Sequence, residues 1–162
     1  MLLLDKGADI NAQGGRWGNA LQVASAGGHE AVVKMLLDKG ADVNAQGGCY
    51  GNALQAASHR GNEAVGGCYG NALQAASHRG NEAVVKMLLD KGANVNAQGG
   101  EYDNALYAAS YVGYKTVVKM LLNKGADVNA QGGRFGNALQ AASYRHYEAV
   151  VKVLLAWGAK SS

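Results

Sequence analysis

The chain has 162 residues, of which 24 are glycine and none is proline. Glycine is thus about twice as frequent as in an average protein. Disordered low-complexity chains are usually rich in both residues and collagen requires proline, so the composition argues against the first class and excludes the second. Hydrophobic residues make up 48% of the chain but aromatic residues only 7%, so we expect a core of alanine, valine and leucine.

Charge and cysteine content exclude further classes. A formal net charge of +3 gives no support for nucleic-acid binding. Two cysteines do not make a disulfide scaffold, and no apolar run reaches the ~18 residues of a membrane-spanning helix. We therefore expect a cytoplasmic or nuclear protein that does not bind membranes.

A short motif recurs along the chain. Asn-Ala-Leu-Gln begins at Asn19, Asn52, Asn71 and Asn137, and Asn-Ala-Leu-Tyr begins at Asn104. Successive copies are 33, 19, 33 and 33 residues apart, in chain order. Periodicity on this scale indicates repeated supersecondary units that stack on one another.

Each unit has room for two helices, as the copy that begins at Gly70 illustrates. Asn71 is a good N-cap residue, and Gln74 three positions later could complete a pair that resembles a capping box. We predict a short first helix over residues 72–78 that ends near Gly80.

The second helix of this unit is predicted to begin at Glu82, whose carboxylate suits the positive end of a helix. Gly92 is expected at the C′ position in the left-handed conformation, and residues 94–100 read as a hairpin-like loop. Helical spacing predicts one apolar stripe, formed by Ala83, Val84, Met87 and Leu88.

A 33-residue helix–turn–helix–loop unit that contains Gly-Ala-Asp-Val-Asn-Ala resembles the ankyrin repeat. The family's Thr-Pro-Leu-His opening is represented here by Asn-Ala-Leu-Gln, in which asparagine keeps the capping role and alanine replaces proline. This variety resembles the arrays attached to fungal nucleotide-binding signalling proteins. The resemblance implies an all-α solenoid that binds a protein or peptide partner on a concave face of loop tips and first helices.

The repeat pattern divides the chain, read as a single ankyrin-repeat domain, into six units. They are a partial repeat (1–13), a repeat (14–46), a truncated repeat (47–65), two further repeats (66–98 and 99–131) and a C-terminal repeat (132–162). Because the array begins within a repeat, we expect either a fragment or a truncated gene product, acting as a monomer or as part of a longer chain.

The truncated repeat is an exact copy, since residues 47–65 have the same sequence as residues 66–84. It has a first helix but almost no second helix, so it cannot be an ordinary stable repeat. It either stacks as a stunted unit, or it loops out so that the Asn71 repeat stacks directly on the Asn19 repeat. We favour the second arrangement.

The sequence offers little for catalysis. The two cysteines and four histidines lack the spacing of a zinc site, and no P-loop is present. The recurring aspartates fit loop and cap positions better than an acid–base pair, and no nucleophile, base and oxyanion set can be assembled. We therefore expect neither enzymatic activity nor a cofactor or metal.

Differences between the repeats point to a binding surface instead. The second helices are nearly constant, whereas the loop tips and the ends of the first helices vary, and all five arginines fall in this variable set. Arginine and tyrosine are enriched in interface hot spots, whereas lysine is depleted. The predicted partner-binding residues are Arg16, Trp17, Tyr50, His59, Arg60, Tyr69, His78, Arg79, Glu101, Tyr102, Asp103, Tyr107, Tyr111, Val112, Arg134, Phe135, Tyr144 and Arg145.

Three alternatives stay open. The aromatic residue at each loop tip could pack the loop against its neighbour rather than bind a partner. The arginines could make the array a basic nucleic-acid binder, although Glu101 and Asp103 lie in the same set. The exact copy also fits a non-binding product of repeat shuffling. We expect an unknown protein or peptide partner.

Overall fold

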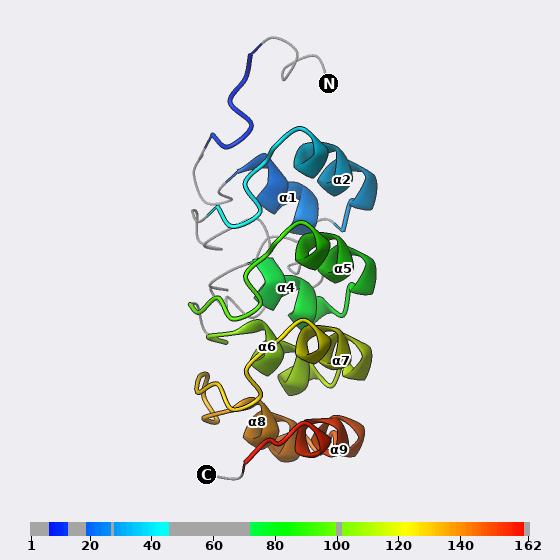
Figure 1. The fold of residues 1–162 in the computed structure, drawn as a ribbon, viewed down its shortest axis with the longest axis vertical. Coiled ribbons are helices and arrows are strands. Elements are labelled where there is room, and N and C mark those ends of the chain that lie inside the picture. Colours follow the sequence, from blue (N-terminus) through cyan, green and yellow to red (C-terminus); the bar gives the residue numbers. More distant parts are fainter. Residues whose placement is uncertain (1–6, 13–18, 27, 46–71, 100–101, 161–162) are drawn as a thin grey trace.

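The computed structural model describes residues 7–12, 19–26, 28–45, 72–99 and 102–160. Within these residues the chain forms pairs of antiparallel helices that stack along one axis (Figure 1). The first helix of each pair lies in one layer and the second helix in the other. The pairs are α1 (Ala20–Ala26) with α2 (Glu30–Asp38), α4 (Ala72–Arg79) with α5 (Glu82–Asp90), α6 (Ala105–Val112) with α7 (Lys115–Asn123), and α8 (Ala138–Tyr144) with α9 (Glu148–Ala156).

Asparagine caps the first helices α6 and α8, as the sequence predicts. The side-chain oxygen of Asn104 accepts a hydrogen bond from the backbone N–H of Tyr107 at 2.8 Å, and that of Asn137 accepts one from Gln140 at 2.9 Å. Each bond satisfies one of the N–H groups that a helix leaves unpaired in its first turn. Asn71, at the equivalent position, lies outside the described residues.

Glycine ends the second helices. Gly92 has a φ of +86°. Its N–H donates to the carbonyl of Leu89 at 3.2 Å, and the N–H of Ala93 donates to the carbonyl of Leu88 at 2.9 Å. These two bonds form a Schellman motif, which requires a left-handed residue at this position. The prediction for Gly92 is confirmed.

The core lies between the two layers and between successive second helices. In α5 the buried side chains are Val84, Val85, Leu88 and Leu89. The predicted stripe was wrong in one member, because Ala83 is exposed, whereas Met87 is half-buried and packs against the core.

The reason is that a second helix has neighbours on two sides, whereas a single-stripe pattern assumes one. Val32 of α2 and Leu155 of α9 are equivalent to Val84 and Leu89 of α5. They are 41% and 52% exposed, since α2 and α9 are the first and last second helices in the described part. The equivalent positions of α5 are buried, because α5 has a second helix packed on each side.

The loops are joined by a ladder of asparagines. The side-chain oxygen of Asn96 accepts the N–H of Asp127 at 2.8 Å, and its amide donates to the carbonyl of Gly125 at 3.0 Å. Asn44 makes the same two bonds to Asn94 and Gly92, at 3.1 and 3.2 Å. These bonds span 50 and 48 residues for Asn44, against 31 and 29 for Asn96.

The difference of 19 residues is the length of the copied segment. The repeat that contains α2 therefore packs directly on the repeat that contains α5, as the second of the two arrangements requires. The copied residues 47–65 themselves lie outside the described part of the chain.

No helix in the described ranges is long and apolar enough to cross a membrane.

Candidate protein-binding surface

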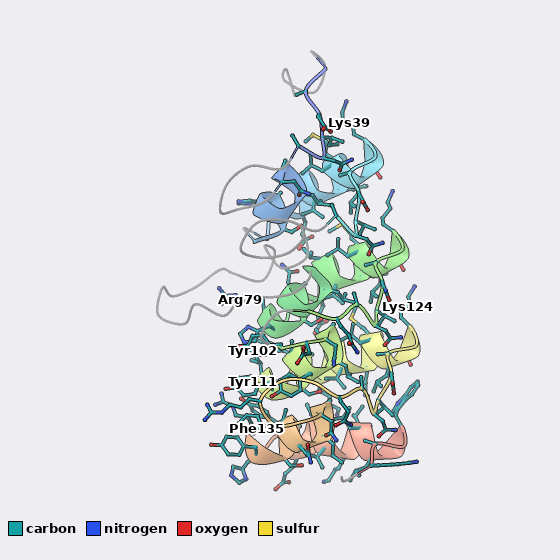
Figure 2. The ribbon with its side chains drawn as sticks, turned by 90° about the vertical axis from the view of Figure 1, so that its left-hand side faces the viewer. Lys39, Arg79, Tyr102, Tyr111, Lys124 and Phe135 are labelled. Atoms are coloured by element: carbon teal, nitrogen blue, oxygen red, sulfur yellow. The ribbon has the colours of Figure 1, made fainter. Side chains whose placement is uncertain are left out.

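The ends of the first helices and the loops that follow each repeat share one edge of the stack. Figure 2 shows Arg79, Tyr102, Tyr111 and Phe135 along this edge, while Lys124 lies on the opposite side. Arg79 ends α4 and Tyr111 lies in the last turn of α6, whereas Tyr102 and Phe135 come from loops. The stacking of the repeats therefore brings together positions that are distant in sequence.

Five rings on this edge form a continuous series, which we call the aromatic ladder. The centroid distance is 4.8 Å from His78 to Tyr102, 5.7 Å from Tyr102 to Tyr111, 6.0 Å from Tyr111 to Phe135 and 4.2 Å from Phe135 to Tyr144. Offset or tilted pairs at such distances are favourable. The ladder runs across three repeats, from α4 to α8.

Tyr107 lies beneath the ladder rather than on it. Its side chain is 1% exposed, and its ring is stacked 6.3 Å from that of Tyr111 at an angle of 7°. Its hydroxyl oxygen accepts the backbone N–H of Phe135 at 3.1 Å. Burial raises the pKa of the Tyr107 hydroxyl above its ordinary value of 10.0. Contrary to the expectation of a surface contact, Tyr107 positions the next loop.

Tyr102 is also buried, at 8% exposure, so its ring packs the loop as the first alternative reading proposed. The rest of the ladder reaches the surface. His78, Tyr111 and Phe135 are half-buried, and Tyr144 is 63% exposed.

Asp103 joins two successive loops. Its carboxylate Oδ2 accepts the backbone N–H of Gly133 at 2.5 Å. Asp103 itself has a φ of +55°, an uncommon conformation for a residue with a side chain. Each of the two loops is closed by an equivalent backbone hydrogen bond. In the first loop the N–H of Gly99 donates to the carbonyl of Asp103 at 2.9 Å, and in the second the N–H of Gly132 donates to the carbonyl of Gly136 at 2.7 Å. Asp103 thus fixes the loop tips relative to each other.

Two arginines lie over rings of this surface. The guanidinium carbon of Arg145 is 4.8 Å from the ring centroid of Tyr111, and that of Arg134 is 5.8 Å from the centroid of Phe135. Both side chains are exposed. Neither forms an ion pair with a carboxylate in the described part of the chain.

The structure therefore brings together the predicted residues that it describes. They come from α4, α6, α8 and the adjoining loops, and Tyr107 lies beneath them. The residues are His78, Arg79, Tyr102, Asp103, Tyr111, Val112, Arg134, Phe135, Tyr144 and Arg145. The other predicted residues lie outside the described ranges: Arg16, Trp17, Tyr50, His59, Arg60, Tyr69 and Glu101.

One feature of this edge was not predicted from the sequence. A shallow pocket of about 520 Å³ is lined by Tyr144, Arg145, His146 and Tyr147. His146 stands where the other repeats have an inter-helix glycine, and it keeps the left-handed backbone with a φ of +59°. The interruption of the glycine pattern at His146 was the signal that could have found it.

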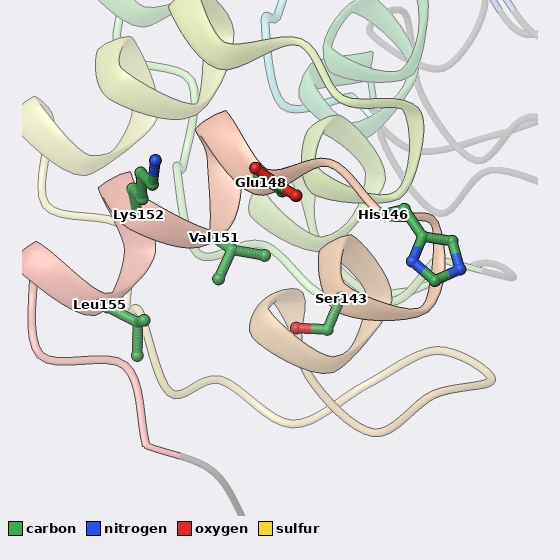
Figure 3. Close-up of a pocket in the computed structure, with 6 residues that line it drawn as sticks. All are labelled: Ser143, His146, Glu148, Val151, Lys152 and Leu155. Carbon is green, nitrogen blue, oxygen red and sulfur yellow. The ribbon is translucent and has the colours of Figure 1, made fainter.

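A second pocket, of about 370 Å³, lies between α8 and α9 (Figure 3). It contains Ser143, His146 and Glu148, the residue types of a catalytic triad. No hydrogen bond joins these three side chains, and the Ser143 hydroxyl and the imidazole of His146 point in different directions. The arrangement therefore lacks the hydrogen bond between nucleophile and base that such catalysis needs.

The described residues also contain no group of three or more His, Cys, Asp or Glu side chains that could hold a metal ion. What this edge offers is a wide, largely preformed surface of rings and guanidinium groups. Such a surface suits contact with another macromolecule better than it suits chemistry on a small substrate.

Comparison with known families agrees with the geometry. A family model of ankyrin repeats in three copies matches residues 52–132 and 72–162, and a model of ankyrin repeats in many copies matches residues 1–37 and 21–65. The chain belongs to the ankyrin repeat family. Its fold is the all-α solenoid of ankyrin repeats, and such repeats are generally non-catalytic modules for protein–protein interaction. A comparison with curated proteins gives no significant match.

Proposed function

We propose that this ankyrin array binds a protein or peptide partner through the edge that carries the aromatic ladder, and that it has no catalytic activity of its own. The observation that carries the proposal is the ladder itself. Rings from three repeats form one surface, and its outer members, Tyr111, Phe135 and Tyr144, remain accessible. Clustered aromatic residues with adjacent arginines are the composition of interface hot spots.

The distribution of positive charge supports the choice of this edge. Arg79, Arg134 and Arg145 lie here, whereas lysines such as Lys91 and Lys124 lie at the ends of second helices. Those two lysines are engaged in ion pairs with Asp38 and Asp90, at 2.7 and 2.9 Å. Their role is explained by the stacking of the repeats, while that of Arg134 and Arg145 is not.

The test is a selection of displayed random peptides on the immobilised 162-residue chain, followed by affinity measurements on the selected peptides. Tyr144→Ala is expected to weaken binding by about tenfold, the effect of a hot-spot ring. Trp157→Ala is the matched control, because Trp157 is a similarly exposed aromatic side chain, 47% against 63%, outside the ladder. Equal affinity for both variants, or no selected peptide at all, would contradict the proposal.

A further inference from the structure

The surface around the aromatic ladder is unevenly charged. Its described residues include three arginines, Arg79, Arg134 and Arg145, against one carboxylate, that of Asp103. This carboxylate already accepts a hydrogen bond from the backbone of Gly133. Among the residues that the structure describes at this edge, positive charge is therefore in excess, while Glu101 lies outside the described residues.

Two arginines of this surface have exposed side chains. The guanidinium groups of Arg145 and Arg134 lie over the rings of Tyr111 and Phe135. Both side chains are exposed, and their guanidinium N–H groups make no ion pair within the described part of the chain. Those N–H groups can bind a carboxylate with two parallel hydrogen bonds.

Three rings of the ladder, those of Tyr111, Phe135 and Tyr144, each lie close to parallel with a neighbouring ring. Tyr111 is stacked against Tyr107 at 7° and against Phe135 at 19°, and Phe135 is stacked against Tyr144 at 25°. Bases of single-stranded nucleic acids bind by stacking on open ring faces. In the ladder each of these rings already has another ring beside it, and the tyrosine hydroxyl groups can donate hydrogen bonds to a carboxylate. These groups suit carboxylates better than bases.

The end of the ladder offers an anchoring point. The shallow pocket beside Tyr144 is lined by two tyrosine rings and by the basic side chains of Arg145 and His146. An apolar side chain can pack on the rings while a neighbouring carboxylate meets Arg145. The surface is elongated because it crosses three repeats, so it fits a segment in extended conformation.

We propose that the partner at this edge is an extended acidic segment of another protein, whose carboxylates bind Arg134 and Arg145 and whose apolar side chain enters the pocket beside Tyr144. This inference rests on the proposed function of the same surface. It adds the chemistry of the partner and gives the two arginines that the stacking leaves unexplained a role as carboxylate-binding residues.

The same peptide selection tests it, with peptides about ten residues long, which span about 33 Å when extended. We expect the selected peptides to be enriched in Asp and Glu relative to the unselected library. Replacement of their acidic residues by Asn and Gln is expected to weaken binding by about tenfold, as is the double variant Arg134→Gln/Arg145→Gln.

The matched control is Lys86→Gln/Lys119→Gln, which removes the same net charge from exposed positions of α5 and α7. Its effect should be less than about twofold, since the charges lie away from the ladder. Selected peptides that are neutral or basic but still depend on Tyr144 would overturn the acidic partner while leaving the proposed function intact. Tighter binding of a thymidine oligonucleotide than of the selected peptides would also overturn it.

Discussion

The ammonium nitrogen of Lys91 lies 2.7 Å from a carboxylate oxygen of Asp38, although 53 residues separate them in sequence. The equivalent pair in the next two repeats, Lys124 and Asp90, is 2.9 Å apart and 34 residues apart in sequence. The same contact is therefore made with and without 19 additional residues between the partners. Repeats that flank the copied segment are packed as ordinary neighbours.

Deletion of residues 47–65 should therefore leave the fold intact. Because residues 47–65 and 66–84 are identical, the product is the same protein whichever copy is removed, and Asn19 and Asn71 become separated by one 33-residue period. We expect the unfolding temperature, followed by circular dichroism, to stay the same or to rise. A shorter connection lowers the entropic cost of closing the loop, by about 0.6 kcal/mol for each halving of the loop length.

The control is a deletion of equal length, residues 80–98, which removes α5 with its four buried side chains. This variant should lose most of its stability, since each such side chain contributes roughly 1.5–3 kcal/mol on burial. If deletion of residues 47–65 proved as damaging, the copied segment would have to contribute to the core.

The two ion pairs predict an acid-sensitive component of stability. The hydrogen bond from Lys91 lowers the pKa of Asp38 below its ordinary value of 3.8, and that from Lys124 does the same for Asp90. A lowered pKa in the folded state stabilises the fold above the ordinary pKa, and this contribution is lost as pH falls through the lowered value. We expect the free energy of unfolding to decrease on acidification below about pH 4, less steeply in Asp38→Asn/Asp90→Asn. The free energy of unfolding is measured by chemical denaturation at pH 5 and at pH 3. An equal decrease between the two pH values in the wild type and in the double variant would argue against the pairs.

His146 provides a site for stabilisation. It has a φ of +59°, whereas the equivalent residues in other described repeats are glycines, such as Gly80 with a φ of +67°. A side chain in this region costs roughly 1–2 kcal/mol, partly offset by the greater freedom of glycine in the unfolded chain. His146→Gly should therefore raise the free energy of unfolding by about 1 kcal/mol in urea denaturation. Arg145→Gly is the control, because Arg145 has a φ of −86°, and this variant should lower the free energy of unfolding. A His146→Gly protein less stable than the Arg145→Gly protein would disprove the strain at His146.

The hydroxyl of Tyr107 is expected to stabilise the loop that carries Phe135. Tyr107→Phe removes the acceptor of the Phe135 N–H, and a lost partner of this kind costs about 1–2 kcal/mol. Tyr144→Phe is the control, because that side chain is exposed. Since burial raises the pKa of Tyr107, wild-type stability should fall as pH rises above 10.0, and Tyr107→Phe should lack this part of the decrease. Equal stability of the two variants in thermal denaturation would count against the bond.

Features that depend on local hydrogen bonds were predictable from the sequence. Asn104 and Asn137 cap helices, and Gly92 ends one, because these residues act on backbone groups only a few positions away. The order of first and second helices follows from the same signals. The 33-residue period then predicts that the helix pairs stack side by side, as in ankyrin repeats.

Features that depend on a neighbouring repeat were not predictable in this way. Tyr107 was predicted to bind a partner, and other repeats have glutamine at the equivalent position, as at Gln140. Its burial depends on the loop of the next repeat, where Gly133 lies so close that an added methyl group would overlap the Tyr107 ring. The burial of Val85 and Leu89 likewise depends on packing between neighbours.

The packing of the ladder determines how rigid the exposed edge is. Tyr111 is held between Tyr107 and Phe135, and Phe135 between Tyr111 and Tyr144, so a change of rotamer at one ring requires its neighbours to move. Contacts of this kind restrict the side chains of the surface before any partner binds. A partner that binds it has little further ordering to impose, and a larger share of each contact appears as affinity.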